Sequence, residues 1–167
     1  MRLMDTPLVQ TRMDSPLGWL RLSHADGRLV SLDFLAAKQP GFLSIPLRAL
    51  GHEWLCKPLL DYFTDGHRPI ALPLDLRGTD FQRRVWQALL QIPPGQTRSY
   101  GQLARQLGSS AQAVGNACRA NPCPLVVPCH RVLAKQGLGG YCGQTQGEQL
   151  QIKRWLLRHE GVGLDWV

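Results

Sequence analysis

Long hydrophobic stretches are missing from this sequence. No run approaches the roughly 20 uncharged apolar residues that a bilayer-spanning helix needs, and the N-terminus alternates charges where a secretory signal would be apolar. Apolar residues still make up 44% of the 167 residues, which is ample for one buried core. Disordered and collagen-like classes are therefore excluded, and we expect a soluble cytoplasmic protein with no membrane partner.

Acidic side chains are scarce in the second half of the chain. Between residues 80 and 160 there are three of them against ten arginines and lysines, whereas residues 1–79 hold eight acidic and nine basic side chains. The formal net charge is +7. This distribution favours a polyanionic partner such as nucleic acid for the second half, although an ordinary solvated basic surface has the same composition.

The cysteines form neither an even set nor a Cys-x-x-Cys pair. Five cysteines, in a chain long enough to fold without disulfides, indicate reduced thiols in a cytosol-like compartment. The histidines show no metal-ligand spacing either, so we expect no metal site. Cys56 and Cys118 fall on apolar helical stripes and are interpreted as core thiols, whereas Cys123 and Cys142 flank a third cysteine, Cys129.

The first 77 residues predict a small α/β lobe. Residues 19–22 and 30–34 alternate with period two around the turn signal Asp26-Gly27, which predicts a hairpin of an antiparallel sheet. After a break at Pro40-Gly41, residues 47–63 are predicted to be helical. We place the lobe boundary near residues 76–78. The expected fold class is α+β, with this lobe packed on a mostly helical C-terminal lobe of residues 78–167.

The C-terminal lobe predicts a helix-turn-helix. The capping-box spacing at residues 79–82 starts one helix, and apolar residues then recur at i, i+3, i+4 and i+7 from Tyr100 and again from Ala111, on either side of a Gly108-Ser109-Ser110 turn. The last of these helices leaves polar residues on one face, interleaved with small ones. Such a slim face suits close approach to a duplex, including its minor groove, and equally suits tight helix packing. The residues of this face are Gln112, Ala113, Asn116 and Arg119.

The segment 121–132 carries the candidate chemistry. Its prolines exclude a helix and lead into the pair Cys129-His130. A thiolate is the reactive form of cysteine, and the imidazole or the cation of Arg131 is expected to lower the pKa of Cys129. Adjacent side chains point in different directions, so His130 is expected to reach the sulfur through a water or a tight turn, with Glu160 orienting its ring. The alternative is a packed cysteine beside a hydrogen-bonded histidine.

Several segments together carry a resemblance to a known family. They are Pro128-Cys129-His130-Arg131-Val132, residues 113–117 leading to Asn121-Pro122, and residues 15–18, 78–86, 99–104 and 155–161. On these segments the chain resembles the O6-alkylguanine-DNA alkyltransferases, also called methylated-DNA–protein-cysteine methyltransferases. The resemblance is dense in the C-terminal half and sparse in the first 77 residues.

The resemblance implies a repair protein that acts as a monomer without a cofactor. Such a protein binds duplex DNA in the minor groove, flips an alkylated guanine into a pocket and transfers the alkyl group irreversibly to Cys129. It implies that His130 is a water-mediated base, Glu160 its orienting partner and Asn121 the residue that orders the active-site turn. The remaining implied positions are the pocket residues Tyr100, Cys118, Val132, Tyr141 and Cys142, and the DNA-binding residues Tyr100, Gln112, Ala113, Asn116 and Arg119.

Two departures from the family pattern have consequences. Gln112 stands where the family usually has an arginine, after a turn that looks short, so weaker DNA binding with a smaller salt dependence is expected. A glutamine-rich stretch, residues 144–149, lengthens the loop beside the pocket and either alters the accepted alkyl groups or is a tolerated insertion. Acceptance of O4-alkylthymine stays open. Alternative functions are a lesion sensor without transfer, a helix-turn-helix regulator with Cys129 as a redox switch, and a cysteine hydrolase.

Overall fold

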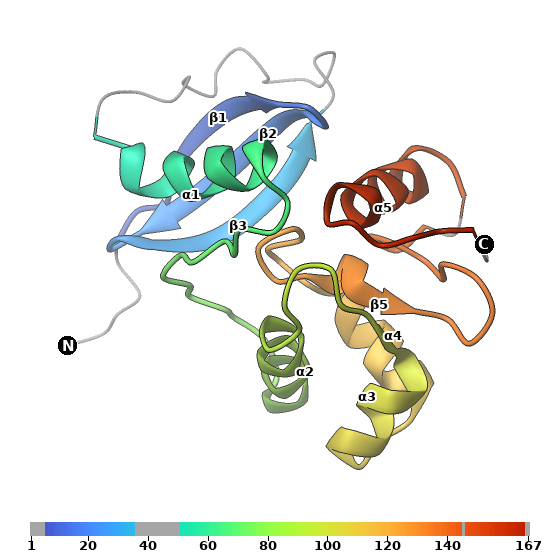
Figure 1. Ribbon diagram of the computed structural model, residues 1–167. Helices are drawn as coiled ribbons and strands as arrows, with labels where there is room; N and C mark the ends of the chain where they lie inside the picture. The colour runs from blue at the N-terminus through green and yellow to red at the C-terminus, as the bar shows by residue number, and fades with distance from the viewer. Residues whose placement is uncertain (1–5, 36–50, 145, 166–167) are drawn as a thin grey trace.

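The computed structural model describes residues 6–35, 51–144 and 146–165. The chain begins with a three-stranded antiparallel sheet in the order β1-β2-β3, formed by β1 (Val9–Ser15), β2 (Gly18–Ala25) and β3 (Arg28–Leu35). Helix α1 (Glu53–Thr64) lies across one face of the sheet (Figure 1). Five buried apolar side chains of the strands belong to the hydrophobic core, namely Met13, Leu20, Leu22, Leu29 and Leu32.

Both hairpin turns follow from local sequence. Asp26 and Gly27 take positive φ angles of 50° and 69°, as a two-residue hairpin loop requires, so the predicted hairpin is confirmed. The β1–β2 turn is held by Ser15, whose hydroxyl accepts from the amide of Leu17 and donates to the carbonyl of Gly18 at 2.7 Å. Strand β1 itself was not anticipated from the sequence.

Helix α1 begins later than the sequence pattern suggests. The expected helix spans residues 47–63, of which residues 47–50 lie outside the described residues. Gly51 has a φ of +97°, and His52 precedes the first helical residue. A backbone with positive φ does not continue a right-handed helix, so the helix starts at Glu53. The expected break at Pro40-Gly41 also lies outside the described residues.

The C-terminal half is mostly helical. Its elements are α2 (Asp80–Leu90), the short parallel pair β4 (Arg98–Ser99) and β5 (Val132–Leu133), α3 (Tyr100–Leu107), α4 (Ala111–Arg119), the 3-10 turn η2 (Cys129–Arg131) and α5 (Glu148–His159). Complete capping boxes start α2 and α3, at Thr79 with Gln82 and at Ser99 with Gln102. Gly108, with a φ of +63°, ends α3, and the side chain of Ser110 caps α4.

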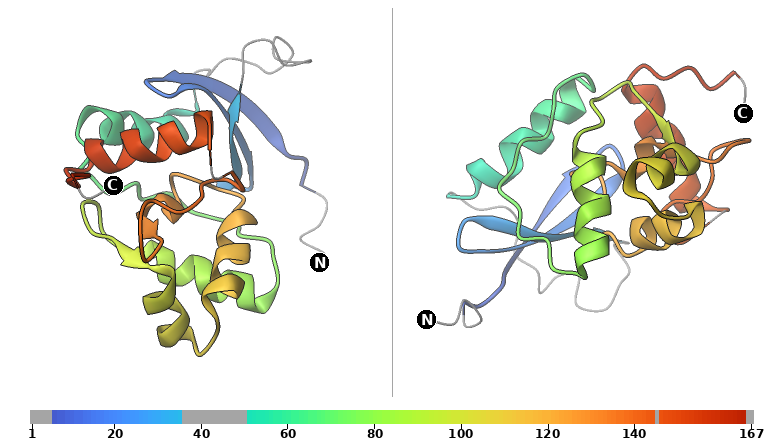
Figure 2. Two further views of the ribbon diagram at one scale, coloured as in Figure 1. Left: turned by 90° about the vertical axis from the view of Figure 1, so that its right-hand side faces the viewer. Right: turned by 90° about the horizontal axis from the view of Figure 1, so that it is seen from below.

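Helices α2, α3 and α4 lie together on the side of the molecule away from the sheet, while α5 lies beside the sheet (Figures 1 and 2). The α+β fold is therefore as predicted. One hydrophobic core runs through both halves, and the amide of Leu32 in β3 donates to the carbonyl of Pro122 at 2.9 Å. The division into lobes at residue 77 stays a prediction. Within the described residues, no helix combines the length and the apolar character that crossing a bilayer requires.

Candidate active site

The turn that presents Cys129 is held by Asn121. Its side-chain amide donates to the carbonyl of Val127 at 2.9 Å, and its side-chain oxygen accepts from the amide of Cys123 at 2.9 Å. Inside this ring the chain reverses through Leu125, which has a φ of +78°. Asn121 thereby replaces the hydrogen bonds that the neighbouring prolines cannot make, and the chain enters η2 at Cys129 with a fixed direction.

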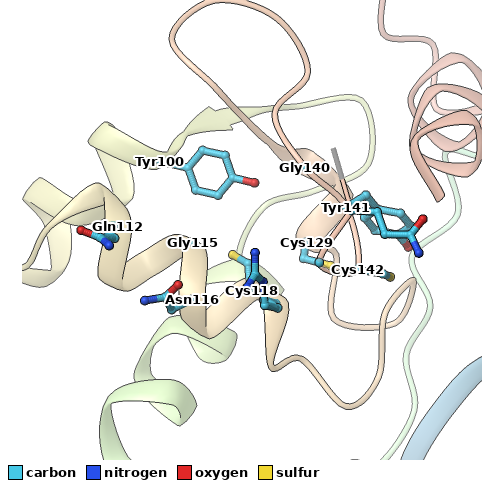
Figure 3. Close-up of a pocket in the computed structure, with 12 residues that line it drawn as sticks. Tyr100, Gln112, Gly115, Asn116, Cys118, Cys129, Gly140, Tyr141 and Cys142 are labelled. Carbon is cyan, nitrogen blue, oxygen red and sulfur yellow. The ribbon is translucent and has the colours of Figure 1, made fainter. Parts of the chain in front are cut away.

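Cys129 lies at the floor of a cavity of about 230 Å³. One wall comes from α3 and α4, with Tyr100, Gly115 and Cys118, and the opposite wall is the loop of residues 140–144 (Figure 3). The hydroxyl of Tyr100 points from the helices toward the Gly140 side (Figure 3). Cys129 itself is only 4% exposed. The α3–α4 side therefore offers one route to the sulfur, through a pocket of limited size. A second cavity, of about 310 Å³ and lined by residues of β3, also reaches Cys129.

His130 follows Cys129 but points into the protein, as its fully buried ring shows. Its Nε2 lies 2.7 Å from Oε1 of Glu160, the residue that directly follows α5. Its Nδ1 is buried and has no protein hydrogen-bond partner among the described residues. Burial lowers the pKa of His130, and the hydrogen bond to Glu160 only partly opposes this. The ring is therefore neutral at rest, with Nε2–H donating to Glu160 and Nδ1 left as an acceptor.

Glu160 is also the anion that neutralises Arg131. The guanidinium donates to Glu160 through Nε, at 3.0 Å to Oε2, and through Nη2, at 2.7 Å to Oε1, while Nη1 donates to the carbonyl of Ile92. Burial alone would raise the pKa of Glu160, but the hydrogen bonds from His130 and Arg131, with the positive charge of Arg131, outweigh it and hold the pKa at about 2. The carboxylate stays ionised throughout the neutral range.

The expected lowering of the Cys129 pKa is wrong. Burial raises the pKa of Cys129, and a hydrogen bond from Asn121 and the positive charge of Lys153 offset this only in part. Arg131 makes no such contribution because its charge is committed to Glu160. The resting site therefore holds a neutral thiol beside a neutral imidazole.

Lys153 is a site residue that the sequence analysis did not identify. It is fully buried in α5, and its ammonium group donates to three carbonyls, of Val132 at 2.7 Å, Leu138 at 2.6 Å and Gly140 at 2.9 Å. Burial lowers its pKa to about 8, while the neighbouring thiols oppose this. Lys153 thus fixes the loop that leads to Tyr141. The sequence signal was its place on the apolar face of α5, three residues before Leu156.

The structure brings most of the expected pocket residues together. Cys118, Tyr141 and Cys142 line the cavity with Tyr100, and burial raises the pKa values of Cys118 and Cys142 to about 12. Val132 does not line it; this residue is fully buried behind the wall, where its carbonyl accepts from Lys153. Cys118 was interpreted from its helical position as a core thiol, and the structure places it both in the core and in the cavity wall.

A broader groove of about 820 Å³ continues from the cavity over α3 and α4. Gln112, Asn116 and Arg119 project from α4 as exposed side chains, with Ala113 half-buried between them. Gly115 lies where α4 passes Tyr100, and Arg105 and Lys135 border the groove with positive charge. The described residues contain no cluster of three or more histidine, cysteine or acidic side chains that could hold a metal ion.

Comparisons with known proteins point to one family. Residues 80–162 match the family described as 6-O-methylguanine DNA methyltransferase, DNA binding domain. The methylated-DNA–protein-cysteine methyltransferase of Salmonella typhimurium is 52% identical over 111 residues, which cover 64% of this chain and 62% of that protein. The chain thus matches less than two thirds of that relative. The Mycolicibacterium paratuberculosis protein of the same name is 41% identical over 161 residues, covering 91% and 94%.

Solved structures of similar proteins superpose on this chain along nearly its whole length. The Mycobacterium tuberculosis O6-methylguanine methyltransferase superposes with a TM-score of 0.78 at 39% identity, covering 92% of this chain and 93% of that one. The Mycobacterium tuberculosis OGT in complex with DNA gives a TM-score of 0.75 at 39% identity, covering 91% and 92%.

Proposed function

Since this chain belongs to the methylated-DNA–protein-cysteine methyltransferase family, we propose that it repairs DNA by moving the alkyl group of an O6-alkylguanine in a duplex onto the sulfur of its own Cys129. The observation that carries this proposal is the position of Cys129. It lies at the floor of a pocket that opens onto the α3–α4 face, and it is followed in the chain by a histidine whose far nitrogen contacts a buried carboxylate.

The proton transfer follows from the resting state of the site. Nδ1 of His130, acting through a water, takes the thiol proton of Cys129 as the sulfur attacks the alkyl carbon. A sulfur–carbon bond forms, the carbon–O6 bond breaks, and the imidazolium is stabilised by Glu160. Burial raises the pKa of Tyr100, so its hydroxyl remains a donor that supports the guanine leaving group. The proton ends on guanine, and nothing regenerates the thiol from the thioether.

The α4 face supports a duplex partner. Gly115 and Ala113 are small, so little side-chain bulk projects from this face near Tyr100. Arg105 and Lys135 supply positive charge along the adjoining groove. We propose that α4 enters the minor groove and that Gln112 fills the gap left by the flipped base. A monomer is sufficient for this arrangement, because the catalytic and DNA-facing residues all come from one chain. Action in the cytoplasm remains part of the proposal.

A single-turnover assay tests the function. The protein is mixed with a duplex containing one O6-methylguanine, and the guanine restored in the DNA is counted against the protein added. Alkyl transfer predicts at most one guanine per protein molecule and no activity in a second addition of DNA. Lesion-selective binding without restored guanine would indicate a sensor, operator-specific binding a regulator, and repeated turnover on an ester a cysteine hydrolase.

A further inference from the structure

A residue of α1 reaches the buried carboxylate beside the nucleophile. The ring of Tyr62 is fully buried, and its hydroxyl donates to Oε1 of Glu160 at 2.8 Å, across 98 residues of sequence. His159 also contacts Tyr62. Its Nε2 lies 2.7 Å from the carbonyl of Tyr62, and the two rings pack edge-on with their centroids 5.2 Å apart. The hydroxyl is therefore fixed in place by α1 and by the end of α5.

The oxygen that Tyr62 contacts is the one that serves His130. Oε1 of Glu160 is within 2.7–2.8 Å of three groups, Nε2 of His130, Nη2 of Arg131 and the Tyr62 hydroxyl. Oε2 accepts from Nε of Arg131 at 3.0 Å and from the amide of Gly95 at 3.4 Å. A carboxylate offers about four lone-pair sites, so this one is fully occupied and its orientation is set. Each donor to Oε1 also reduces the negative charge that His130 meets.

We infer that Tyr62 is a positioning residue for alkyl transfer, which holds Glu160 and shares its charge so that His130 rests neutral with Nδ1 facing away from the carboxylate. This inference rests on the proposed function. The charged groups that act on His130 are Glu160, Arg131 and Lys153. Helix α1 contributes Tyr62 to this cluster, and the end of α5 contributes His159, whose ring packs against Tyr62. The N-terminal half thereby takes part in the chemistry.

The variant Tyr62→Phe keeps the ring and removes one donor from Oε1. More negative charge then faces His130, and its pKa rises. A protonated His130 does not accept the Cys129 proton, so the acid limb of the transfer rate moves to higher pH. We expect a displacement of about one pH unit, which is about a tenfold loss of rate at a fixed pH on that limb. DNA binding is expected to stay within about twofold, because Tyr62 is fully buried and belongs to α1, which lies apart from α4 (Figure 1).

The matched control is Leu59→Val. Leu59 is also fully buried in α1, and the change removes a methylene but no hydrogen-bond donor. Nitrogen-15 NMR of the imidazoles gives the tautomer and the pKa of His130 in the wild type and both variants, and single-turnover rates give the acid limb. The inference predicts a raised His130 pKa in Tyr62→Phe alone. If His130 has the same pKa and the transfer rate has the same acid limb in the two variants, Tyr62 has only a structural role and the inference is overturned.

A second change covers the case in which Tyr62→Phe does not fold. Incorporating 3-fluorotyrosine at position 62 keeps the ring and makes the hydroxyl a stronger donor, so the His130 pKa is expected to fall and the acid limb to move to lower pH. No change, or a change in the other direction, would contradict the inference. Should the wild type fail to transfer an alkyl group, the proposed function fails, while the NMR titration still decides the part played by Tyr62.

Discussion

Replacing Glu160 by glutamine removes the negative charge that Arg131 and His130 share. The guanidinium, in a residue only 6% exposed, is then left without its counter-ion. Taking one partner out of a buried ion pair costs about 3–5 kcal/mol. The pKa of Glu160 gives a similar figure, since a value of about 2 in the folded chain against an ordinary 4.5 corresponds to about 3 kcal/mol. At roughly 2–4 °C per kcal/mol, Tm falls by about 6–20 °C.

The pH dependence of this loss has a definite sign. The pKa of Glu160 is depressed by folding, so its contribution to stability is present above the unfolded value near 4.5 and disappears as the pH falls toward about 2. The stability gap between wild type and Glu160→Gln should therefore be constant at neutral pH and narrow between about pH 5 and pH 2. Urea unfolding at a series of pH values measures it.

A surface pair provides the control for Glu160→Gln. Asp75 accepts from Nε and Nη2 of Arg77, with both side chains at least 40% exposed, and such pairs contribute no more than about 1 kcal/mol. Asp75→Asn should unfold almost as the wild type does and transfer at its rate. Glu160→Gln should slow transfer more than it weakens DNA binding. Equal unfolding midpoints and equal transfer rates for the two variants would refute this account of Glu160.

Three further changes test other parts of the site. Lys153→Met leaves three backbone carbonyls without their donor, so we expect about 3 kcal/mol lower stability and faster hydrogen exchange of residues 132–141, and unchanged exchange there would contradict the role of Lys153. Gln112→Arg should tighten DNA binding and steepen its salt dependence by about one unit in the log–log slope, as measured by fluorescence titration; an unchanged slope would place residue 112 away from DNA. Cys129→Ser should abolish transfer and keep lesion binding, and transfer at the wild-type rate in this variant would refute the nucleophile.

The sequence was most informative where structure depends on near neighbours. The capping residue Thr79 starts a helix within three residues of its partner Gln82, and the Asp26-Gly27 turn needs only its own backbone. The pairing of His130 with Glu160 was also predicted, because acidic residues are scarce in that half and Glu160 is one of three.

What the sequence did not indicate depends on distant partners. Strand β1 carries mainly polar side chains, with Thr11 and Met13 its buried residues, and it is a strand because β2 pairs with it. Tyr62 sits in an apolar helical segment, and no local pattern reveals that its hydroxyl meets Glu160. The predicted direction of the Cys129 pKa shift was wrong for the same reason. The burial of the thiol and the ion pair between Arg131 and Glu160 are properties of the folded chain.

The central claim is that Cys129 is the alkyl acceptor, and peptide mass spectrometry tests it most directly. The wild type and Cys123→Ser are each incubated with a duplex containing one O6-methylguanine; Cys123 is buried in the same turn, outside the pocket that leads to Cys129. In both proteins we predict one added methyl on Cys129, matched by an equal amount of restored guanine. A methyl group found on Cys118 or Cys142 instead, or restored guanine with an unmodified Cys129, would contradict the account.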